Sequence, residues 1–334
     1  MGREPPMGHP LQAAEIRPSL VNLVNLEQDP GPYGMSFGFD LDLLVRSIRE
    51  IGLINAPCVT EKPSGQMNII TGYRRVMAAR ALEWSGLPCR DLTPLDLSPL
   101  HLLVLALKDN MTTRVFNDVE KGMVLSRLAT HVPREQVLNQ YMPMLHLPSN
   151  DPLLTLFLDL EEADTDIKKA VSNGRLPLRN VKRLLELQSG SRDMVFYWLS
   201  NMKFNANQQV QFIETIEDIS RREKKGIHDI LEEKEMLRLF HDDKRNNPQK
   251  AKHVLEVLRR RRFPMLTKTE QAFRKQIAGL VLPNGITIHH PPHFEGSQYQ
   301  LEACFKNGTE LRKRLEKLVR MKDLDKVGDP WEES

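Results

Sequence analysis

The stretch Ile69-Ile70-Thr71-Gly72-Tyr73-Arg74-Arg75-Val76-Met77-Ala78-Ala79-Arg80 decides how this part of the chain folds. An apolar strand runs into a glycine, two adjacent arginines follow, and an alanine-rich helix begins. Such a junction brings backbone N–H groups and two cations together at the positive end of a helix dipole. We therefore predict a binding place for an anion at this junction, and phosphate is the usual anion in such places.

The sequence on either side of the junction predicts an α+β fold. Residues 40–52 have the apolar spacing of a helix, and two short strands, 58–60 and 68–70, precede the junction. From Ser98 onward the pattern is almost wholly helical, and Asn117 with Glu120 predicts the capped start of a helix that runs through Ala129. Near the C-terminus two strand patterns, 286–290 and 299–305, predict a hairpin. The expected segments are a disordered leader (1–15), a small α+β domain (16–97), a helical domain like a helix-turn-helix (98–188), a helical linker region with a basic end (189–262), a small α+β C-terminal domain (263–322) and a tail (323–334).

Composition narrows the class of protein. Aromatic residues make up only 6% of the chain, which favours helices over an all-β fold. Cys58, Cys89 and Cys304 are widely spaced and form no CxxC or zinc pattern, so we expect a reduced, cytoplasmic protein. The longest apolar run, 102–107, is far too short to span a bilayer, and no membrane association is expected.

Positive charge is concentrated in one region of the chain. The net charge is only +3, but residues 244–275 contain eleven Lys and Arg and two acids. Arg259-Arg260-Arg261-Arg262 has two interpretations: the solvated end of a helix, where cations favour the dipole, or a contact with nucleic acid. Both remain open at this point.

Three segments resemble the ParB family, the centromere-binding proteins of bacterial DNA segregation. Residues 47–57 are similar to the family's SI-x-x-x-GL-x-x-P segment, and Gly72–Ala79 is similar to its glycine–any–Arg–Arg box. Residues 109–120 resemble its E-N-x-x-R … N-x-x-E element. The elements occur in the family's order, and the resemblance covers about residues 16–187.

The resemblance implies a CTP-binding switch domain of the fold shared by ParB and sulfiredoxin, followed by a helix-turn-helix. It implies that CTP contacts Thr71, Gly72, Arg74, Arg75, Asn110 and Arg114, and that Asp109 and Asn110 hold Mg²⁺. It also implies DNA as a partner, a homodimer, a ParA-type ATPase as a possible second partner, and a nucleoid-associated role in DNA partitioning or nucleoid organisation.

Two departures from the family bear on chemistry. Tyr73 stands where many members have a glutamate linked to hydrolysis, and Asp109 replaces the usual glutamate of the third element. We therefore expect nucleotide binding with at most slow CTP hydrolysis. Sulfiredoxin resembles the same loop but needs a cysteine directly after the glycine, and Tyr73 occupies that position, so a thiolate enzyme is excluded.

The expected helix-turn-helix is degenerate. Its scanning helix corresponds to 134–142 and its recognition helix to about 150–160, which contains no Lys or Arg. Recognition helices need polar or basic side chains towards bases and phosphates. Either this helix only packs, or DNA is contacted elsewhere. The candidate DNA-binding residues are Lys168, Lys169, Arg179, Lys182, Arg183, Arg259, Arg260, Arg261 and Arg262.

The alternative function is a ParB-fold adaptor or regulator that has lost sequence-specific DNA reading or nucleotide hydrolysis.

Two C-terminal features have structural interpretations. His289, His290 and His293 have no complete set of metal-ligating neighbours, which favours a loop with surface histidines. Leu311, Leu315 and Leu318 recur at helical spacing, and we expect them in the core of the C-terminal domain rather than in a zipper.

Overall fold

A computed structural model describes residues 16–291, 294, 298–321, 324 and 327. The leader expected over 1–15 lies outside the described residues, as does the tail expected over 323–334 apart from Leu324 and Val327. The chain divides into two compact units, Met1–Phe196 and Tyr197–Ser334, and each is described by itself. None of the described helices has the length and hydrophobicity that a bilayer crossing requires.

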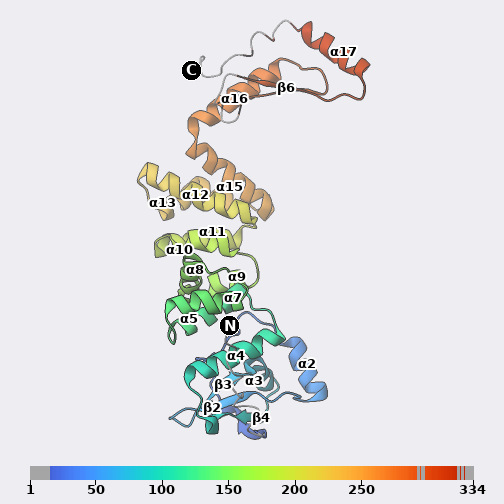
Figure 1. The fold of residues 1–334 in the computed structure, drawn as a ribbon. Coiled ribbons are helices and arrows are strands. Elements are labelled where there is room, and N and C mark those ends of the chain that lie inside the picture. The colour runs from blue at the N-terminus through green and yellow to red at the C-terminus, as the bar shows by residue number, and fades with distance from the viewer. Residues whose placement is uncertain (1–15, 292–293, 295–297, 322–323, 325–326, 328–334) are drawn as a thin grey trace. The chain divides into compact units, whose positions relative to one another are not determined.

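The first unit begins with a four-stranded sheet in the order β1-β4-β2-β3 (Figure 1). The strands are β1 (Ser19–Asn22), β2 (Cys58–Glu61), β3 (Met67–Thr71) and β4 (Gly86–Asp91). The two central strands, β2 and β4, run parallel, whereas both outer pairs are antiparallel. The expected α+β character of this part of the chain is therefore present.

Helix α3 (Tyr73–Ala81) starts directly after β3, as the opening stretch predicts. Gly72 is its N-cap and has φ of 84°, a left-handed conformation that favours glycine. Val76 and Ala79 are fully buried against the sheet residues Val59 and Ile69. The apolar residues alternate along β3 and recur at helical spacing in α3, and together they form one apolar core beneath the junction.

Helices cover the rest of the first unit. They are α2 (Asp42–Ile51), α4 (Pro99–Thr113), α5 (Asp118–Ala129), α6 (Arg134–Gln136), the π-helical η3 (Val137–Tyr141), α7 (Met142–Met144), α8 (Asp151–Glu162), α9 (Thr165–Ser172) and α10 (Leu178–Leu185). Helix α4 packs on β3, and one hydrophobic cluster joins Ile70 of the sheet to Leu103 and Phe157 of the helices. This cluster spans residue 97, whereas a second cluster, around Val59 and Val76, lies wholly before that residue.

The segment expected to read DNA is a packing helix. Helix α8 buries Leu154, Phe157 and Leu160, and it packs along α5. The scanning segment is one continuous helical stretch in which α6, η3 and α7 follow each other. Of the two interpretations left open by the sequence, the structure supports the one in which α8 serves the core.

The second unit consists of helices followed by a small α+β part. Its elements include the C-terminal half of α11 (Ser189–Asn201), then α12 (Ala206–Glu223), α13 (Ile227–Leu231), α14 (Lys234–Phe240), α15 (Asn247–Arg262), α16 (Pro264–Gly279), β5 (Ile286–His289), β6 (Gln300–Ala303) and α17 (Gly308–Val319). Strands β5 and β6 form the expected hairpin. Leu318 is buried, but Leu315 is 41% exposed, so the expectation that both belong to the core is wrong for Leu315.

Helices α5 and α8 lie in close contact at Gly122. A Cβ atom at this position would lie 2.9 Å from the carbonyl oxygen of Phe157. Backbone atoms of a packed helix cannot move aside as the end of a flexible side chain can. The absence of a side chain at Gly122 is therefore what allows α8 to lie on α5.

We expect Gly122→Ala to destabilise the protein by about 1–3 kcal/mol, the usual cost of overpacking a core. This is opposite in sign to the gain that alanine normally brings inside a helix. Gly190→Ala is the matched control, because Gly190 is also helical and an added Cβ there meets no atom within 4 Å. Urea unfolding of the two variants measures the difference, and equal stabilities would contradict the close approach.

Candidate anion-binding site

The expected anion site lies where three elements meet. Arg74 and Arg75 belong to the first turn of α3, and Thr71 is the buried last residue of β3. Arg114 is the C-cap of α4, and it reaches the same place because α4 packs on β3. The structure thus brings together arginines that are forty residues apart in the sequence.

A buried carboxylate joins two of these arginines. Glu120 of α5 is only 1% exposed, and its Oε1 accepts from Arg74 Nη2 at 2.8 Å. Its other oxygen, Oε2, lies 2.6 Å from Arg114 Nη1. The same side chain completes a capping box with Asn117, whose backbone N–H donates to Oε2 at 3.1 Å. The sequence marks Glu120 as a capping residue and as the last position of the segment that resembles the N-x-x-E element, but neither signal predicts its contact with the two arginines.

The segment Met35–Phe37 closes over this bridge. Phe37 N–H donates to Glu120 Oε1 at 3.1 Å, and the Ser36 hydroxyl accepts from Arg74 Nε at 3.2 Å. Arg114 also donates to the Met35 carbonyl and to the Ser36 hydroxyl. Nothing in the sequence marks these three residues, because their role depends on which carbonyl and hydroxyl groups the fold brings to the arginines.

Aromatic rings cover the two guanidinium groups. Arg74 lies over the ring of Phe39 at 4.8 Å, and Arg114 lies over Phe116 at 4.5 Å. Burial lowers the pKa of Arg114, and the negative charge of Glu120 opposes that shift. Two guanidinium groups and one carboxylate leave a net charge of +1 in a half-buried place. The site retains attraction for an anion, but it is weaker than two free arginines would give.

Arg75 is directed to a different neighbour. Its Nη1 donates to the Asn55 carbonyl at 2.6 Å, in the loop that precedes β2. Gly72 lies close to both Pro57 and the Arg75 guanidinium. A Cβ on Gly72 would be 3.0 Å from the Pro57 side chain and 3.2 Å from Arg75 Cζ. The amides of Tyr73 and Arg74 precede the first hydrogen bonds of α3, and no helix can satisfy its own first amides. These groups form the most anion-receptive edge of the site.

Arg80, the third arginine of the opening stretch, has a structural role. Its Nη2 donates to the carbonyl oxygens of Leu26 and Glu27, each at 3.0 Å, and it also reaches the Leu23 carbonyl. Arg80 therefore fixes the short helix η1 (Leu23–Asn25) against α3. It lies at the far end of α3 from the anion-receptive amides.

The two expected metal ligands differ in their surroundings. Asn110 Oδ1 accepts from Arg114 Nε at 2.9 Å, and its amide nitrogen donates to the Ala106 carbonyl at 2.8 Å. Asp109 is partly exposed at the end of α4. Among the described residues, no group of three or more His, Cys, Asp or Glu is placed to hold a metal ion.

In the C-terminal hairpin His289 pairs with Glu302 and His290 stacks on Phe294, whereas His293 lies outside the described residues.

The candidate DNA-binding residues of the first unit divide into two groups. Lys168 and Lys169 on α9 are each within ion-pair distance of an acid, Glu161 at 3.4 Å and Asp166 at 3.2 Å. Arg179, Lys182 and Arg183 are exposed on α10, at spacings that place them on neighbouring sides of the helix. Helix α10 is thus the more accessible basic element of the two.

The four arginines at the end of α15 are mostly paired with acids. Arg259 pairs with Glu270 at 2.6 Å, and Arg262 pairs with Asp218. Arg261 pairs with Glu223 at 2.6 Å and Glu233 at 2.5 Å, and its hydrogen bonds lower the pKa of both carboxyl groups. Arg260 is exposed, and no ion pair involves it in the described part of the chain. The dense positive charge in the sequence is therefore largely neutralised in space.

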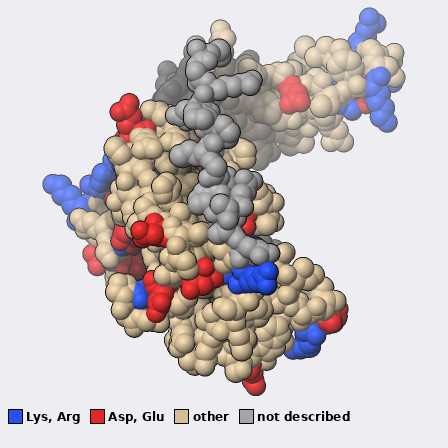
Figure 2. Space-filling view, turned by 60° about the horizontal axis from the view of Figure 1, so that its bottom comes forward, with Lys and Arg blue, Asp and Glu red and all other residues tan. Residues whose placement is uncertain are grey.

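On the face drawn in Figure 2, Lys and Arg stand in small groups between uncharged residues, without a continuous basic field. This distribution agrees with the pairing of most candidate cations. This face therefore presents no broad positive surface.

Comparison with known proteins gives a partial likeness. No model of a known protein family matches the chain. No curated protein matches it either. The chromosome-partitioning protein ParB from Caulobacter crescentus, truncated at its C-terminus and complexed with CTP-γ-S, is 18% identical, with a TM-score of 0.26, over 51% of this chain and 92% of that one. The same protein complexed to the centromeric parS site is 16% identical, with a TM-score of 0.30, over 53% of this chain and 90% of that one. TM-scores of this size do not establish a common fold.

The spacing of two matched segments also differs from the family's motifs. Asn110 and Arg114 are four residues apart, one more than the corresponding positions of the E-N-x-x-R element. Leu53 and Pro57 are likewise separated by one residue more than the motif. Arg114 nevertheless reaches the site, because its position after the end of α4 lets the long side chain turn back towards Glu120.

Proposed function

We propose that this chain is a ParB-like DNA-binding protein whose N-terminal domain responds to CTP and which acts in DNA partitioning or nucleoid organisation. The observation that carries the proposal is the meeting of Arg74 and Arg114 beside the first amides of α3. A triphosphate needs several cations and backbone donors in one place. This junction offers both, in a segment whose sequence resembles the family's phosphate-binding box.

A bound nucleotide would have to compete with Glu120. The phosphates and Glu120 compete for the same guanidinium groups of Arg74 and Arg114. Binding would therefore loosen the bridge, and with it the hold of Glu120 on Phe37. When nucleotide phosphates replace the Glu120 carboxylate at the arginines, the position of the segment at 35–37 becomes coupled to nucleotide binding.

Magnesium would accompany the triphosphate in this proposal. Asp109 supplies a carboxylate, and Mg²⁺ in nucleotide sites is usually held by one or two carboxylates together with phosphate oxygens and water. Asn110 already uses its side-chain oxygen to accept from Arg114, so Asp109 would be the main ligand from this chain. The ion would neutralise phosphate charge. With Tyr73 in place of the hydrolysis-linked glutamate, we propose binding with at most slow hydrolysis.

We expect the full chain to bind CTP in the presence of Mg²⁺, and Arg75→Ala to lose that binding. Glu120→Gln keeps the capping geometry but removes the competing charge, so it should bind CTP about tenfold more tightly, which equals about 1.4 kcal/mol. Calorimetric titration measures the affinities, and thermal melting checks that each variant is folded.

Arg46→Ala is the matched control for Arg75→Ala, because Arg46 is an exposed arginine of α2 outside the site. The nucleotide proposal fails if the wild type binds no nucleotide, or if Arg75→Ala binds as well as the wild type. Weaker binding by folded Glu120→Gln would instead show that Glu120 positions the arginines rather than competing with the ligand.

DNA binding in this proposal rests first on α10. Its basic side chains Arg179, Lys182 and Arg183 are exposed, whereas α8 contains no Lys or Arg. Arg179→Gln combined with Arg183→Gln should reduce the slope of log affinity against log salt by about two, since each phosphate contact contributes about 0.9. Arg259→Gln combined with Arg260→Gln should change the slope less. The reverse order in fluorescence anisotropy of a DNA duplex would contradict the assignment to α10.

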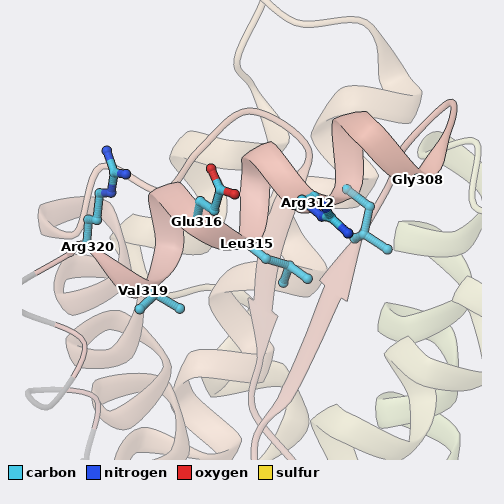
Figure 3. Close-up of a pocket in the computed structure, with 7 residues that line it drawn as sticks. Gly308, Arg312, Leu315, Glu316, Val319 and Arg320 are labelled. Atoms are coloured by element: carbon cyan, nitrogen blue, oxygen red, sulfur yellow. The ribbon is translucent and has the colours of Figure 1, made fainter.

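Self-association is the third part of the proposal, and α17 supports it. Leu315 is 41% exposed and Val319 is 81% exposed, and Figure 3 shows both projecting from the same side of the helix. An exposed apolar stripe of this kind is typical of a protein contact. Arg312, Glu316 and Arg320 border the stripe with alternating charge. In an antiparallel pair of copies related by a two-fold axis near residue 314, Glu316 of each would lie opposite Arg312 of the other.

We expect Leu315→Lys combined with Val319→Lys to convert a dimer into a monomer. The double variant places charges on two side chains that become buried when the dimer forms. Val115→Lys is the control, since Val115 is an exposed valine of the first unit. Sedimentation equilibrium reports the mass. A wild-type monomer, or a double variant that remains dimeric, would remove α17 from this role.

The alternative function is a ParB-fold adaptor, and one observation favours it. Helix α8, in the place of a recognition helix, is apolar on its packed side and carries acids on its exposed side. Sequence-specific DNA reading by this helix is therefore not supported. A ParA-type ATPase as a partner rests on the sequence resemblance alone, and co-sedimentation with such an ATPase on DNA would test it.

A further inference from the structure

A groove in the first unit is lined by residues that the proposed functions leave unused, apart from Lys182 of the candidate DNA-binding set. It lies between α8 and α10, and the start of α11 contributes Arg192 to its wall. Its volume is about 690 Å³. Pro152, Leu156 and Leu185 provide apolar lining. All of these residues belong to one compact unit, so the groove does not depend on how the two units are placed.

The residues of helix α8 form two stripes: a packed stripe that faces the core and a groove stripe that lines the groove. The packed stripe is Leu154, Phe157 and Leu160, which are buried; Leu156 is also buried, at 9% exposed, although it lines the groove. The groove stripe recurs every three to four residues and consists of Asp151, Pro152, Thr155, Leu156, Asp159, Glu162 and Ala163. Because α8 rises about 1.5 Å per residue, the groove stripe is about 17 Å long, the length of three helical turns.

The groove has a negative rim. Four carboxylates line it, from Asp151, Asp159, Glu162 and Glu186, against two cations, Lys182 and Arg192. Asp151 pairs with Arg134, but no ion pair involves Asp159, Glu162 or Glu186 in the described part of the chain. Phosphate-bearing ligands are repelled by such a rim, so it does not suit DNA.

We propose that this groove docks a basic amphipathic helix from a partner protein. Apolar side chains of the partner would enter between Leu156 and Leu185, and its Lys or Arg would meet Asp159 and Glu162. This is the helix-in-groove mode, in which an apolar face gives affinity and charges at the edge give orientation. The inference is independent of nucleotide and DNA binding, and it gives the degenerate helix α8 a use of its own.

The experiment selects from displayed random 16-residue peptides on the full-length protein and then measures the enriched peptides in solution by fluorescence anisotropy. Enriched sequences should carry Lys or Arg beside apolar residues at three- and four-residue spacing. Asp159→Lys combined with Glu162→Lys should weaken their binding at least about tenfold, as like charges replace unlike ones. Both substitutions are at exposed positions, and thermal melting confirms the fold.

The matched control changes the same charge elsewhere. Glu50→Lys combined with Glu135→Lys alters two exposed acids outside the groove and should leave affinity within about twofold, because distant exposed charges are screened by salt. Three results would overturn the proposal: no enrichment, enriched peptides without basic residues, or equal loss of binding in both double variants.

Discussion

The bridge from Arg74 through Glu120 to Arg114 is the interaction on which the N-terminal half of the protein depends. It joins the start of α3, the end of α4 and the start of α5, and it holds the segment at 35–37 through Phe37. A carboxylate that is 1% exposed is tolerated only if its charge and lone pairs are satisfied. Two guanidinium groups and two backbone amides satisfy it here. Removing one partner of such a bridge typically costs about 3–5 kcal/mol, so the bridge fixes the geometry of the site.

The same reasoning explains why arginine-rich sequence is a poor guide to basic surface in this chain. Arg80 is used to bind backbone carbonyl oxygens, Arg261 is held by two glutamates, and Arg74 faces Glu120. Each arginine has five donors and a long side chain, which lets it meet acids from other helices. Accessible positive charge is thus restricted to a few elements such as α10, while the exposed side of α8 is acidic.

Local patterns were sufficient to predict the elements but not their partners. The strand–glycine–helix junction at Gly72, the capped start of α5 at Asn117 and the hairpin of β5 and β6 were all predicted from sequence, because turn chemistry and periodicity act over a few residues. Glu120 as a counter-ion was not predictable, since its capping role is local and its contact with Arg74 is not. The hydrophobic cluster that spans residue 97 and the exposure of Leu315 were not predicted, because both depend on packing between distant segments.

Hydrogen exchange of the Phe37 amide reports directly on the bridge, because that amide donates to Glu120 while Glu120 holds both arginines. CTP with Mg²⁺ should change protection at Phe37 and in the residues around Gly72 together, since the phosphates take the arginines from Glu120. If CTP binds and protection at Phe37 and Gly72 stays as it is without nucleotide, the nucleotide lies elsewhere, and the bridge is a structural element only.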